Sequence, residues 1–377
     1  MTEPTQDQRF MARALELAEQ GRPSPNPRVG AVIVAAGKIV GEGFHAKAGG
    51  AHAEVAAIES AQKSGANIAG ATLYVTLEPC NHVGRTPPCT KAILAAKIAR
   101  VVVGCSDPNP HVEGGGVAAL TAAGVQVTSG VLEAEAKALI APWTKFVTTG
   151  LPYVALKLAL SLDGRIATRT GSSKWVTGRD ARARVHALRA QADAVAVGIN
   201  TALADDPRLT VRAAKGENPV RVVFDTKLRL ATHLRLVTTA REIPTWVVAS
   251  EDAETSLEEE LTSRGVEVLR VPVGTEGRVD VHLAARALAE RGIVSLMVEG
   301  GAELAGSLLA TRLADELHAF LAPILLGPRA RAAAVDWAGP DEPQHAPRIV
   351  SPSWEVCGED AHVWGRIAYP AAPAEPG

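Results

Sequence analysis

The chain has 377 residues, of which 47% are hydrophobic and only 4% aromatic, and its formal net charge is −2. A single core stops growing at about 250–300 residues, so this length predicts two domains, packed mainly by Ala, Val and Leu as in α/β proteins with parallel sheets. The weak net charge gives no reason to expect nucleic-acid or membrane partners, no apolar run could span a bilayer, and four cysteines without a secretory signal predict a cytoplasmic protein.

The first part of the chain alternates between expected helices and strands. A helix is expected at residues 10–20, paired strands at 31–35 and 39–44, a helix from residue 52, a strand at 73–77, a helix at 90–97, a strand at 100–105, a helix at 114–123, a strand at 125–128 and a helix at 132–146. This order predicts a three-layer α/β/α domain over residues 1–148.

A set of possible zinc ligands lies within this domain. His52 and Glu54 begin an apolar helical pattern, Cys80 follows a buried strand, and Cys89 begins another helix. A catalytic zinc is held by three protein ligands and keeps one position for water, whose pKa it lowers towards neutrality. The pattern predicts zinc on His52, Cys80 and Cys89, with Glu54 carrying the proton of that water.

The spacing of these residues indicates a reaction class. His-x-Glu followed by Pro-Cys-x-x-Cys is typical of zinc nucleobase deaminases. Here Cys80 and Cys89 are separated by eight residues, Asn81 to Pro88. The predicted chemistry is therefore hydrolytic deamination, while the substrate need not be a base within a nucleic acid. Taken alone, the histidine and the cysteines could also be reduced core residues.

The rest of the chain predicts a second domain, at residues 151–370, with a mainly parallel sheet. Strands are expected at residues 153–160, 193–198, 220–224, 246–249, 266–271, 294–298 and 362–368, and helices at 177–190, 257–263, 281–290 and 302–310. Residues 371–377 are expected to form a disordered tail.

Several residues of this domain stand out from their surroundings. Lys157 lies in an apolar strand, where an unpaired charge is costly to bury, and Asp205 and Asp206 follow another strand in an expected loop. Gly300 and Gly301 lie between a strand and a helix, where a pyrophosphate could approach the helix N-terminus. Each feature also has a purely structural explanation: an edge-strand lysine, an Asp-Pro turn and a tight glycine turn.

Phosphate and nucleotide binding are less clearly marked. Arg189 and Arg212 are the best candidates for phosphate ligands, since arginine can bind a phosphate bidentately. No Gly-x-Gly-x-x-Gly follows the first strand of the domain, so the usual Rossmann fingerprint is absent. Asp225 ends a strand, and in a Rossmann domain an acidic residue at such a position would repel the 2′-phosphate of NADPH.

Four segments of the first domain resemble the deaminase half of the bifunctional deaminase–reductases of riboflavin biosynthesis. They are Asn26 to Gly30, His52 to Glu54, Glu78 to Cys89, which includes the eight-residue spacing, and Asp107 to Pro110. The resemblance implies a cytidine-deaminase-like fold that acts on a phosphoribosylated diaminopyrimidinone. It implies zinc on His52, Cys80 and Cys89, Glu54 as the acid and base, and a substrate pocket lined by Asn26, His82, Arg85 and Asn109. Gly115 departs from the family pattern, in which a basic residue is expected.

The second domain resembles the reductase half of the same family. The matching segments are Lys157 to Arg165, Trp175, Thr201 to Asp206, Leu209 to Arg212, and Glu299 to Gly301. The resemblance implies a dihydrofolate-reductase-like α/β fold that uses NADPH, with Asp205 and Lys157 as the polar catalytic residues. The implied cofactor contacts are Ala159, Trp175, Thr201, Asp205, Thr226, Gly301, Ala302, Glu303, Leu304, Ala305, Gly306 and Ser307. The implied substrate contacts are Ser173, Arg189, Leu209, Arg212 and Glu299.

These observations predict a cytoplasmic homo-oligomeric enzyme with small-molecule partners. Its first domain would deaminate the pyrimidine with zinc, and its second would reduce the ribosyl group to ribityl with NADPH. A tRNA or DNA base deaminase is one alternative, although it would need a basic and aromatic strand-binding face. A protein without enzymatic activity is another, in which His82 would complete a closed structural zinc site.

Overall fold

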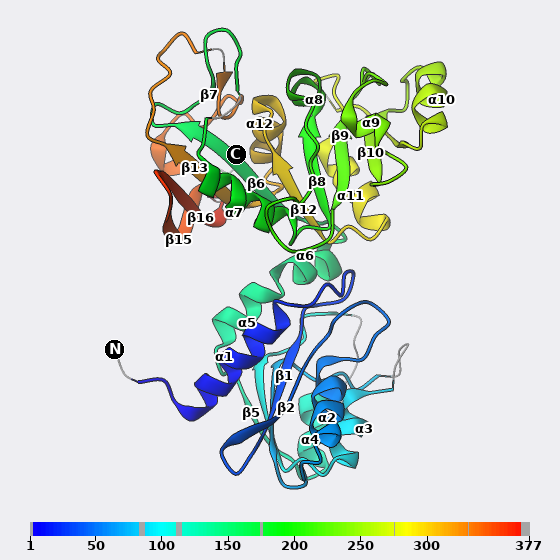
Figure 1. The fold of residues 1–377 in the computed structure, drawn as a ribbon, viewed down its shortest axis with the longest axis vertical. Coiled ribbons are helices and arrows are strands. Elements are labelled where there is room, and N and C mark those ends of the chain that lie inside the picture. The colour runs from blue at the N-terminus through cyan, green and yellow to red at the C-terminus, as the bar shows by residue number, and fades with distance from the viewer. Residues whose placement is uncertain are drawn as a thin grey trace, which may run out of the picture. The chain divides into compact units, whose positions relative to one another are not determined.

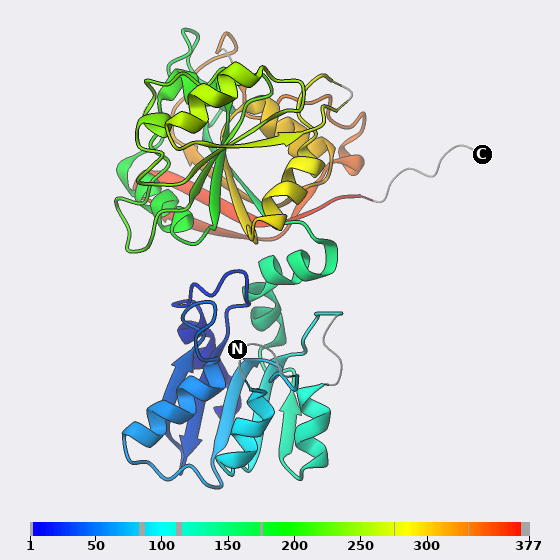
Figure 2. The ribbon, with the colours of Figure 1, turned by 90° about the vertical axis from the view of Figure 1, so that its right-hand side faces the viewer.

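The computed structural model describes residues 3–82, 87–110, 115–173, 176–274, 276–330 and 332–370. The chain divides into two compact units, Met1–Leu151 and Pro152–Gly377, and both can be followed by colour in Figures 1 and 2. Residues 371–377, the expected tail, lie outside the described part of the chain. Within the described ranges, every helix is too short or too polar to cross a membrane.

The first unit is a five-stranded sheet of order β2-β1-β3-β4-β5 between helices. In this sheet β1 is antiparallel to β2 and β3, whereas β3, β4 and β5 are parallel. Helix α1 packs its Met11 and Leu17 on Val32 and Tyr74 at one face, and α2, α3 and α4 lie at the other (Figure 1). The elements are α1 (Gln6–Ala18), β1 (Gly30–Ala35), β2 (Lys38–Phe44), α2 (Ala53–Lys63), β3 (Thr72–Leu77), α3 (Cys89–Ala95), β4 (Arg100–Cys105), α4 (Gly116–Ala122), β5 (Gln126–Ser129), α5 (Glu133–Leu139) and α6 (Ala141–Thr149).

Helix α2 lies unusually close to the sheet because β2 carries glycine where the helix crosses it. A Cβ atom on Gly43 would lie 2.3 Å from the backbone nitrogen of Ala57, and one on Gly41 would lie 2.4 Å from the backbone oxygen of the same residue. Any larger residue at position 41 or 43 would push the helix away. The glycines therefore hold the N-terminus of α2, with His52 and Glu54, against the end of the sheet.

The prediction of a single helix at residues 132–146 is wrong, because two helices, α5 and α6, meet at Ile140. Pro142 lies in the first turn of α6. Proline is tolerated there because the N–H that it lacks would have no partner within the helix. Inside one continuous helix the same proline would remove a backbone hydrogen bond, so the chain starts a new helix instead.

The second unit is built on a nine-stranded sheet of order β11-β10-β9-β8-β12-β6-β13-β16-β15. The strands are parallel from β11 to β13, and β16 and β15 are added antiparallel at one edge. The elements are β6 (Tyr153–Ser161), β7 (Arg165–Ala167), α7 (Arg179–Arg189), β8 (Ala194–Gly198), α8 (Ile199–Asp205), β9 (Val220–Phe224), α9 (Arg235–Thr238), β10 (Thr245–Ser250), α10 (Thr255–Ser263), β11 (Glu267–Val271), α11 (Val281–Glu290), β12 (Ser295–Glu299), α12 (Ala302–Ala310), β13 (Ala314–Ala322), β14 (Ala332–Ala333), the short 3₁₀ helix Pro343–His345, β15 (Arg348–Cys357) and β16 (Asp360–Ala368).

The parallel strands are apolar on both faces. In β12, Leu296 and Val298 point to one face and Met297 to the other, and all three are buried. Met297 belongs to a core cluster to which α7 contributes Ala181 and Val185. Continuous apolar strands are expected where both faces of a parallel sheet are covered.

Several elements of this unit differ from the expectation, among them the short β7, α9, β14 and 3₁₀ helix, which were not expected. The segment after β8, expected as a loop, is the short helix α8, so Asp205 ends a helix. Strands β13 and β15 have no counterpart among the expected elements. The first mixes Glu316 and His318 with apolar residues, and the second contains Pro352, so neither shows the apolar pattern of a buried strand. Proline is tolerated in β15 because it is the edge strand of the sheet.

Candidate active sites

The first unit brings the three predicted zinc ligands together. His52 is the N-cap of α2, Cys80 follows β3, and Cys89 is the first residue of α3. The Nδ1 atom of His52 lies 3.2 Å from Sγ of Cys89 and 3.6 Å from Sγ of Cys80. Zinc prefers nitrogen and sulfur ligands at about 2.0–2.3 Å, so these separations fit three corners of a tetrahedron. Among the described residues, no fourth ligand joins this group.

The two thiols have opposite tendencies, because their mutual contact and burial raise the pKa of Cys89 while the same contact lowers that of Cys80. Hydrogen bonding from Cys89 lowers the pKa of the Cys80 thiol to about 4. The backbone N–H of Cys89 also donates to Sγ of Cys80, at 3.4 Å. Because a thiolate rather than a thiol binds zinc, the start of α3 favours the ligand form of Cys80.

Glu54 lies beside this cluster on the first turn of α2. The residue is only 3% exposed, and burial raises the pKa of its carboxyl group to about 7. A general acid and base works best when its pKa is near the operating pH. The site can therefore hold or release a proton next to the position of the metal.

The cluster opens into a cavity of about 420 Å³, lined among others by three of the predicted substrate residues, Asn26, His82 and Asn109. The fourth, Arg85, lies outside the described residues. His45, whose role the sequence leaves open, lines the same cavity. Its Nε2 atom lies 3.0 Å from Nδ2 of Asn26, and its Nδ1 atom lies 3.0 Å from the backbone oxygen of Ala51.

These two contacts indicate that His45 positions the Asn26 side chain. If Nδ1 carries the proton and donates to Ala51, Nε2 can accept from the Asn26 amide, which fixes the Asn26 side chain with its oxygen available as an acceptor. The only sequence signal for this pairing is the location of His45 at the end of a strand, so sequence reasoning could not find it.

Gly115, where the sequence comparison led us to expect a basic residue, lies beside Glu78. A Cβ atom on Gly115 would lie 2.8 Å from Oε1 of Glu78. That same oxygen accepts the backbone N–H of Val117 at 3.0 Å. A side chain at position 115 would therefore require the Glu78 carboxylate to shift.

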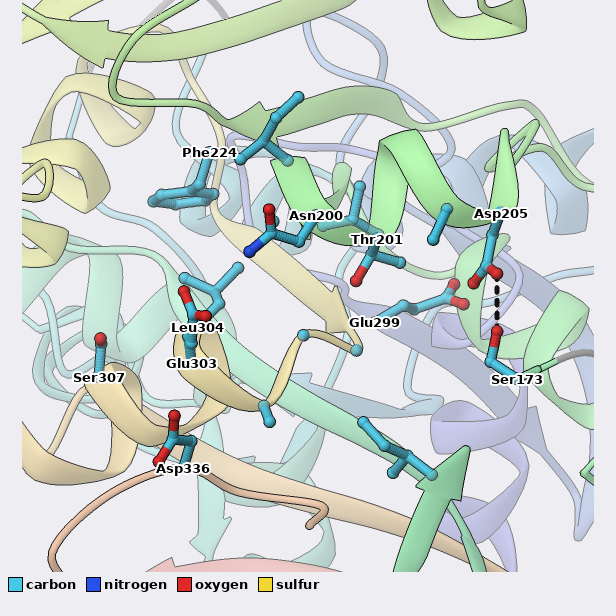
Figure 3. Close-up of a pocket in the computed structure, with 18 of the residues that line it drawn as sticks. Ser173, Asn200, Thr201, Asp205, Phe224, Glu299, Glu303, Leu304, Ser307 and Asp336 are labelled. Carbon is cyan, nitrogen blue, oxygen red and sulfur yellow. Dashed lines mark hydrogen bonds between the residues drawn. The ribbon is translucent and has the colours of Figure 1, made fainter. Parts of the chain in front are cut away.

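In the second unit, most predicted residues line one cavity of about 1170 Å³ at the carboxyl ends of β6, β8, β9 and β12. Ligands of open α/β sheets bind at this end of the strands, and the volume is ample for a dinucleotide and a substrate. Figure 3 shows residues of this cavity. The predicted residues that line it are Lys157, Ala159, Ser173, Arg189, Thr201, Asp205, Leu209, Thr226, Glu299, Gly301, Ala302, Glu303, Leu304 and Ser307.

Four predicted contacts are not among the lining residues. Trp175 lies outside the described part of the chain. Ala305 and Gly306 face the interior: Ala305 is fully buried, and a Cβ atom on Gly306 would lie 1.9 Å from a backbone oxygen of Asp336. Arg212 is exposed beside the cavity, where it donates to Oγ1 of Thr210 at 2.7 Å.

A network of charged side chains lies at one end of this cavity. Arg189 forms a two-pronged ion pair with Glu299, in which Nη2 lies 2.8 Å from Oε2, and its Nη1 donates to the backbone oxygen of Thr210 at 3.1 Å. Burial lowers the pKa of Lys157, against the opposing effect of Glu299. Asp205 accepts a hydrogen bond of 2.7 Å from the Ser173 hydroxyl (Figure 3). The cluster thus combines the Lys157 amine, whose pKa is lowered, with the carboxylates of Asp205 and Glu299.

The Arg189–Glu299 pair makes Arg189 a poorer phosphate ligand than the sequence suggests. Burial pushes the pKa of Glu299 upwards, but Arg189 and Lys157 outweigh it and the net pKa is lowered. The side chains are only 12% and 8% exposed. Three N–H groups of Arg189 are already used within the protein, so this guanidinium mainly holds Glu299 in place.

We expect Arg189→Ala to destabilise the protein, by about 3–5 kcal/mol, because it leaves the Glu299 charge buried without a partner. Since the Glu299 pKa is lowered on folding, the contribution of the pair is fully present above the unfolded pKa of about 4.3 and is lost as the pH falls below it. Urea unfolding at several pH values measures both effects. The double variant Arg189→Met/Glu299→Leu should recover much of the stability, and a single variant as stable as the parent would contradict this assignment.

The N-terminus of α12 forms the floor of the same cavity. Gly300 and Gly301 have φ angles of 76° and 91°, which other residues rarely adopt. A Cβ atom on Gly301 would lie 3.5 Å from Oγ1 of Thr201 and 3.8 Å from the backbone nitrogen of Gly198. Gly300, Gly301 and Ala302 line the cavity, so a pyrophosphate could approach the N-terminus of α12 there.

The two units match two different protein families. Residues 4–105 match the cytidine and deoxycytidylate deaminase zinc-binding region, and residues 152–363 match the RibD C-terminal domain. The riboflavin biosynthesis protein RibD of Actinobacillus pleuropneumoniae is 42% identical over 353 residues, which is 93% of each chain. That of Aquifex aeolicus is 45% identical over 324 residues, which is 85% of this chain and 88% of the relative.

Solved structures of similar proteins match this chain over both units. The Thermotoga maritima enzyme described as a diaminohydroxyphosphoribosylaminopyrimidine deaminase and 5-amino-6-(5-phosphoribosylamino)uracil reductase has a TM-score of 0.85 at 39% identity, covering 96% of this chain and 99% of its own. RibD of Acinetobacter baumannii has a TM-score of 0.81 at 38% identity, with the same coverage.

These matches confirm the predicted fold class, a cytidine-deaminase-like unit followed by a dihydrofolate-reductase-like unit. They also confirm the cofactors, zinc for the first unit and NADPH for the second, and the His52, Cys80 and Cys89 cluster provides ligands that fit zinc. The protein is therefore an enzyme, a hydrolytic deaminase and a reductase in riboflavin biosynthesis. The chain belongs to the RibD family of bifunctional riboflavin-biosynthesis enzymes.

Proposed function

We propose that the first unit removes an amino group from a phosphoribosylated diaminopyrimidinone, and that the second reduces the ribosyl group of the product to ribityl. The Thermotoga maritima relative is described by these two substrates. The observation that carries the proposal is the presence of two separate polar clusters, each in its own cavity: His52, Cys80 and Cys89 with Glu54, and Lys157 with Asp205 and Glu299.

In the deaminase cavity, bound zinc would supply the Lewis acid that activates water. We assign to Glu54 the transfer of the proton from that water to the pyrimidine ring and then to the departing ammonia. Its buried carboxyl group, with a pKa of about 7, can both accept and donate at neutral pH. The Asn26 amide, held by His45, presents an oxygen that can accept a substrate N–H.

In the reductase cavity, NADPH would supply the hydride. Opening the ribosyl ring breaks the bond between C1′ and the ring oxygen, so C1′ must gain a hydride and the oxygen a proton. We assign the proton to Lys157 and Asp205. Burial lowers the pKa of the Lys157 ammonium, which makes it a stronger acid. Ser173 holds the Asp205 carboxylate in position.

The proposal is tested by supplying the diaminopyrimidinone phosphoribosylamine with and without NADPH and identifying each product by mass. Without NADPH, we expect one product in which an amino group is replaced by oxygen. With NADPH, we expect a second product heavier by two hydrogens. Reduction of the substrate without prior deamination, or no reaction in either mixture, would contradict the proposed order.

We further propose that the protein forms homo-oligomers through β15. This edge strand exposes Val350, Trp354 and Val356, whose exposed fractions are 51%, 68% and 82%. An exposed edge strand offers unpaired backbone groups to another chain, and large apolar side chains at a surface favour association. A second copy is the simplest partner for both features.

We expect Trp354→Glu and Val356→Lys to shift the protein towards monomers, because each places a charge in the apolar surface. Sedimentation velocity over a range of concentrations measures the shift. Leu325→Glu is a suitable control, since Leu325 is 74% exposed but lies outside β15. A parent protein that is monomeric at micromolar concentration would contradict the proposal.

We infer that the enzyme works in the cytoplasm on small molecules and not on nucleic acid. All four cysteines are free, which fits a reducing compartment. The formal net charge of −2 supports a small-molecule substrate over a polyanion.

A further inference from the structure

The reductase cavity has a second end that the proposed chemistry does not use. Figure 3 shows Asp205 and Ser173 at one side and Phe224, at the end of β9, at the other. The turn after Phe224 contributes Thr226, Lys227 and Arg229 to the lining of the cavity. This turn therefore provides two cationic side chains far along the cavity from the reacting groups.

The buried Asp225 sets the orientation of this turn. Its side chain is fully buried, and its Oδ2 atom accepts the backbone N–H of Leu230 at 2.8 Å. Leu228 is buried as well, with a φ angle of 54°. With these residues pointing inwards, Thr226, Lys227 and Arg229 face the cavity. Asp225 does not line the cavity, so its carboxylate makes no direct contact with a phosphate bound there.

Lys227 and Arg229 are less strongly paired than the third basic residue at this end, Arg278. Arg278 is paired with Glu276 and, at 3.4 Å, with Glu303. Lys227 is exposed, and in the part of the chain that the structure describes it has no ion-pair partner. Arg229 is 51% exposed and donates to Oδ1 of Asn200 at 3.1 Å, while its Nε lies 4.0 Å from Asp225.

A hydroxyl group completes this end of the cavity. Oγ1 of Thr226 accepts the backbone N–H of Val279 at 3.2 Å. This bond ties the turn after β9 to the segment that precedes α11 and uses Thr226 as an acceptor only. Its own O–H remains a donor that can point into the cavity.

The start of α12 determines which part of a dinucleotide would reach this turn. The backbone N–H groups at Gly301 and Ala302 are suited to the pyrophosphate, which is the middle of the cofactor. The nicotinamide must lie towards Lys157 and Asp205, where the substrate is reduced. The adenosine ribose must then lie on the opposite side, towards Phe224 and the turn that follows it.

NADPH differs from NADH only by a phosphate on the 2′-oxygen of this ribose. We propose that Lys227 and Arg229 bind the 2′-phosphate, with a hydrogen bond from Thr226, and so make the reductase selective for NADPH. The inference builds on the NADPH-dependent reductase activity. Two cations facing a dianion form charge-assisted hydrogen bonds, which are stronger than neutral ones, and NADH offers them only a hydroxyl group.

The variants Lys227→Gln, Arg229→Gln and the double variant test this assignment in the full-length protein. Calorimetric titration with adenosine 2′,5′-bisphosphate and with adenosine 5′-phosphate measures the selectivity without turnover. We expect the affinity for the bisphosphate to fall about tenfold for each lost cation and about a hundredfold for both. The affinity for the monophosphate should stay the same. Lys227→Arg should keep the parent values, as should the control Arg291→Gln, whose side chain lies outside the cavity.

Steady-state kinetics provide the second readout. In the double variant, the KM for NADPH should rise while kcat and the KM for NADH stay unchanged. Equal weakening of both adenosine nucleotides would indicate a merely structural role and overturn the proposal, as would unchanged bisphosphate binding. A higher KM for the phosphoribosylated substrate alone would assign the cations to the substrate phosphate instead. The nucleotide titrations are informative even if the proposed substrate is wrong, since they need none.

Discussion

Glu54→Gln is expected to reduce ammonia release by about 10²–10⁴-fold, which is the usual contribution of a general acid and base. Glutamine keeps the size of the side chain but cannot exchange a proton. Because the three predicted zinc ligands remain, the variant should still bind one zinc per chain. Stability should not fall, since burial already disfavours the charged form of Glu54 and raises its pKa to about 7.

Three measurements check this expectation together: ammonia release, zinc content by mass spectrometry, and thermal unfolding. The matched control is the reduction of the deaminated substrate, which should continue at the parental rate in the same preparation. Turnover that survives the substitution would refute the role of Glu54. Loss of zinc would show instead that Glu54 supports the metal site.

Asp205→Asn is expected to lower NADPH oxidation about a hundredfold and to leave deamination intact. Asparagine can still accept the hydrogen bond from Ser173, whose length is 2.7 Å, so the side chain should stay in place. It removes the negative charge that faces Lys157, and with it the electrostatic support for proton transfer. The two activities are measured separately, by absorbance of NADPH and by release of ammonia.

The neighbouring residue provides the control for this experiment. Asp206 follows Asp205 directly, but it accepts the backbone N–H of Arg235 at 2.7 Å and does not line the cavity. Asp206→Asn should therefore keep most of the reductase activity. If Asp205→Asn lowered both activities in a stably folded protein, the division of labour between the two units would be wrong.

The sequence was sufficient for the zinc site because each ligand lies at the end of a predictable element. His52 and Cys89 begin helices, and Cys80 follows a buried strand. Apolar runs predicted most of the parallel strands, since both faces of those strands are buried. Strands β13 and β15 were not predicted, for the opposite reason. Each has a partly exposed face with polar residues or proline, so its sequence lacks the continuous apolar pattern of a core strand.

The reductase residues show where sequence reasoning ends. Helical periodicity groups residues by face, but it does not say which face meets the cavity. Along α12 the cavity is lined by Ala302, Glu303, Leu304 and Ser307, whereas Ala305 and Gly306 are turned to the interior. The family pattern covers this whole stretch, and only the packing of the helix separates the two groups.

By itself, the sequence predicted most of the parallel strands, the three zinc ligands, Glu54 as the candidate acid and base, and the family to which the chain belongs. Only the tertiary structure decided that Arg189 is committed to Glu299, that His45 holds Asn26, and that Asp225 turns away from the cavity. The physical reason is that local patterns depend on neighbours along the chain. An ion pair between residues 110 positions apart, or the direction of a strand-end carboxylate, is fixed by how separate elements pack.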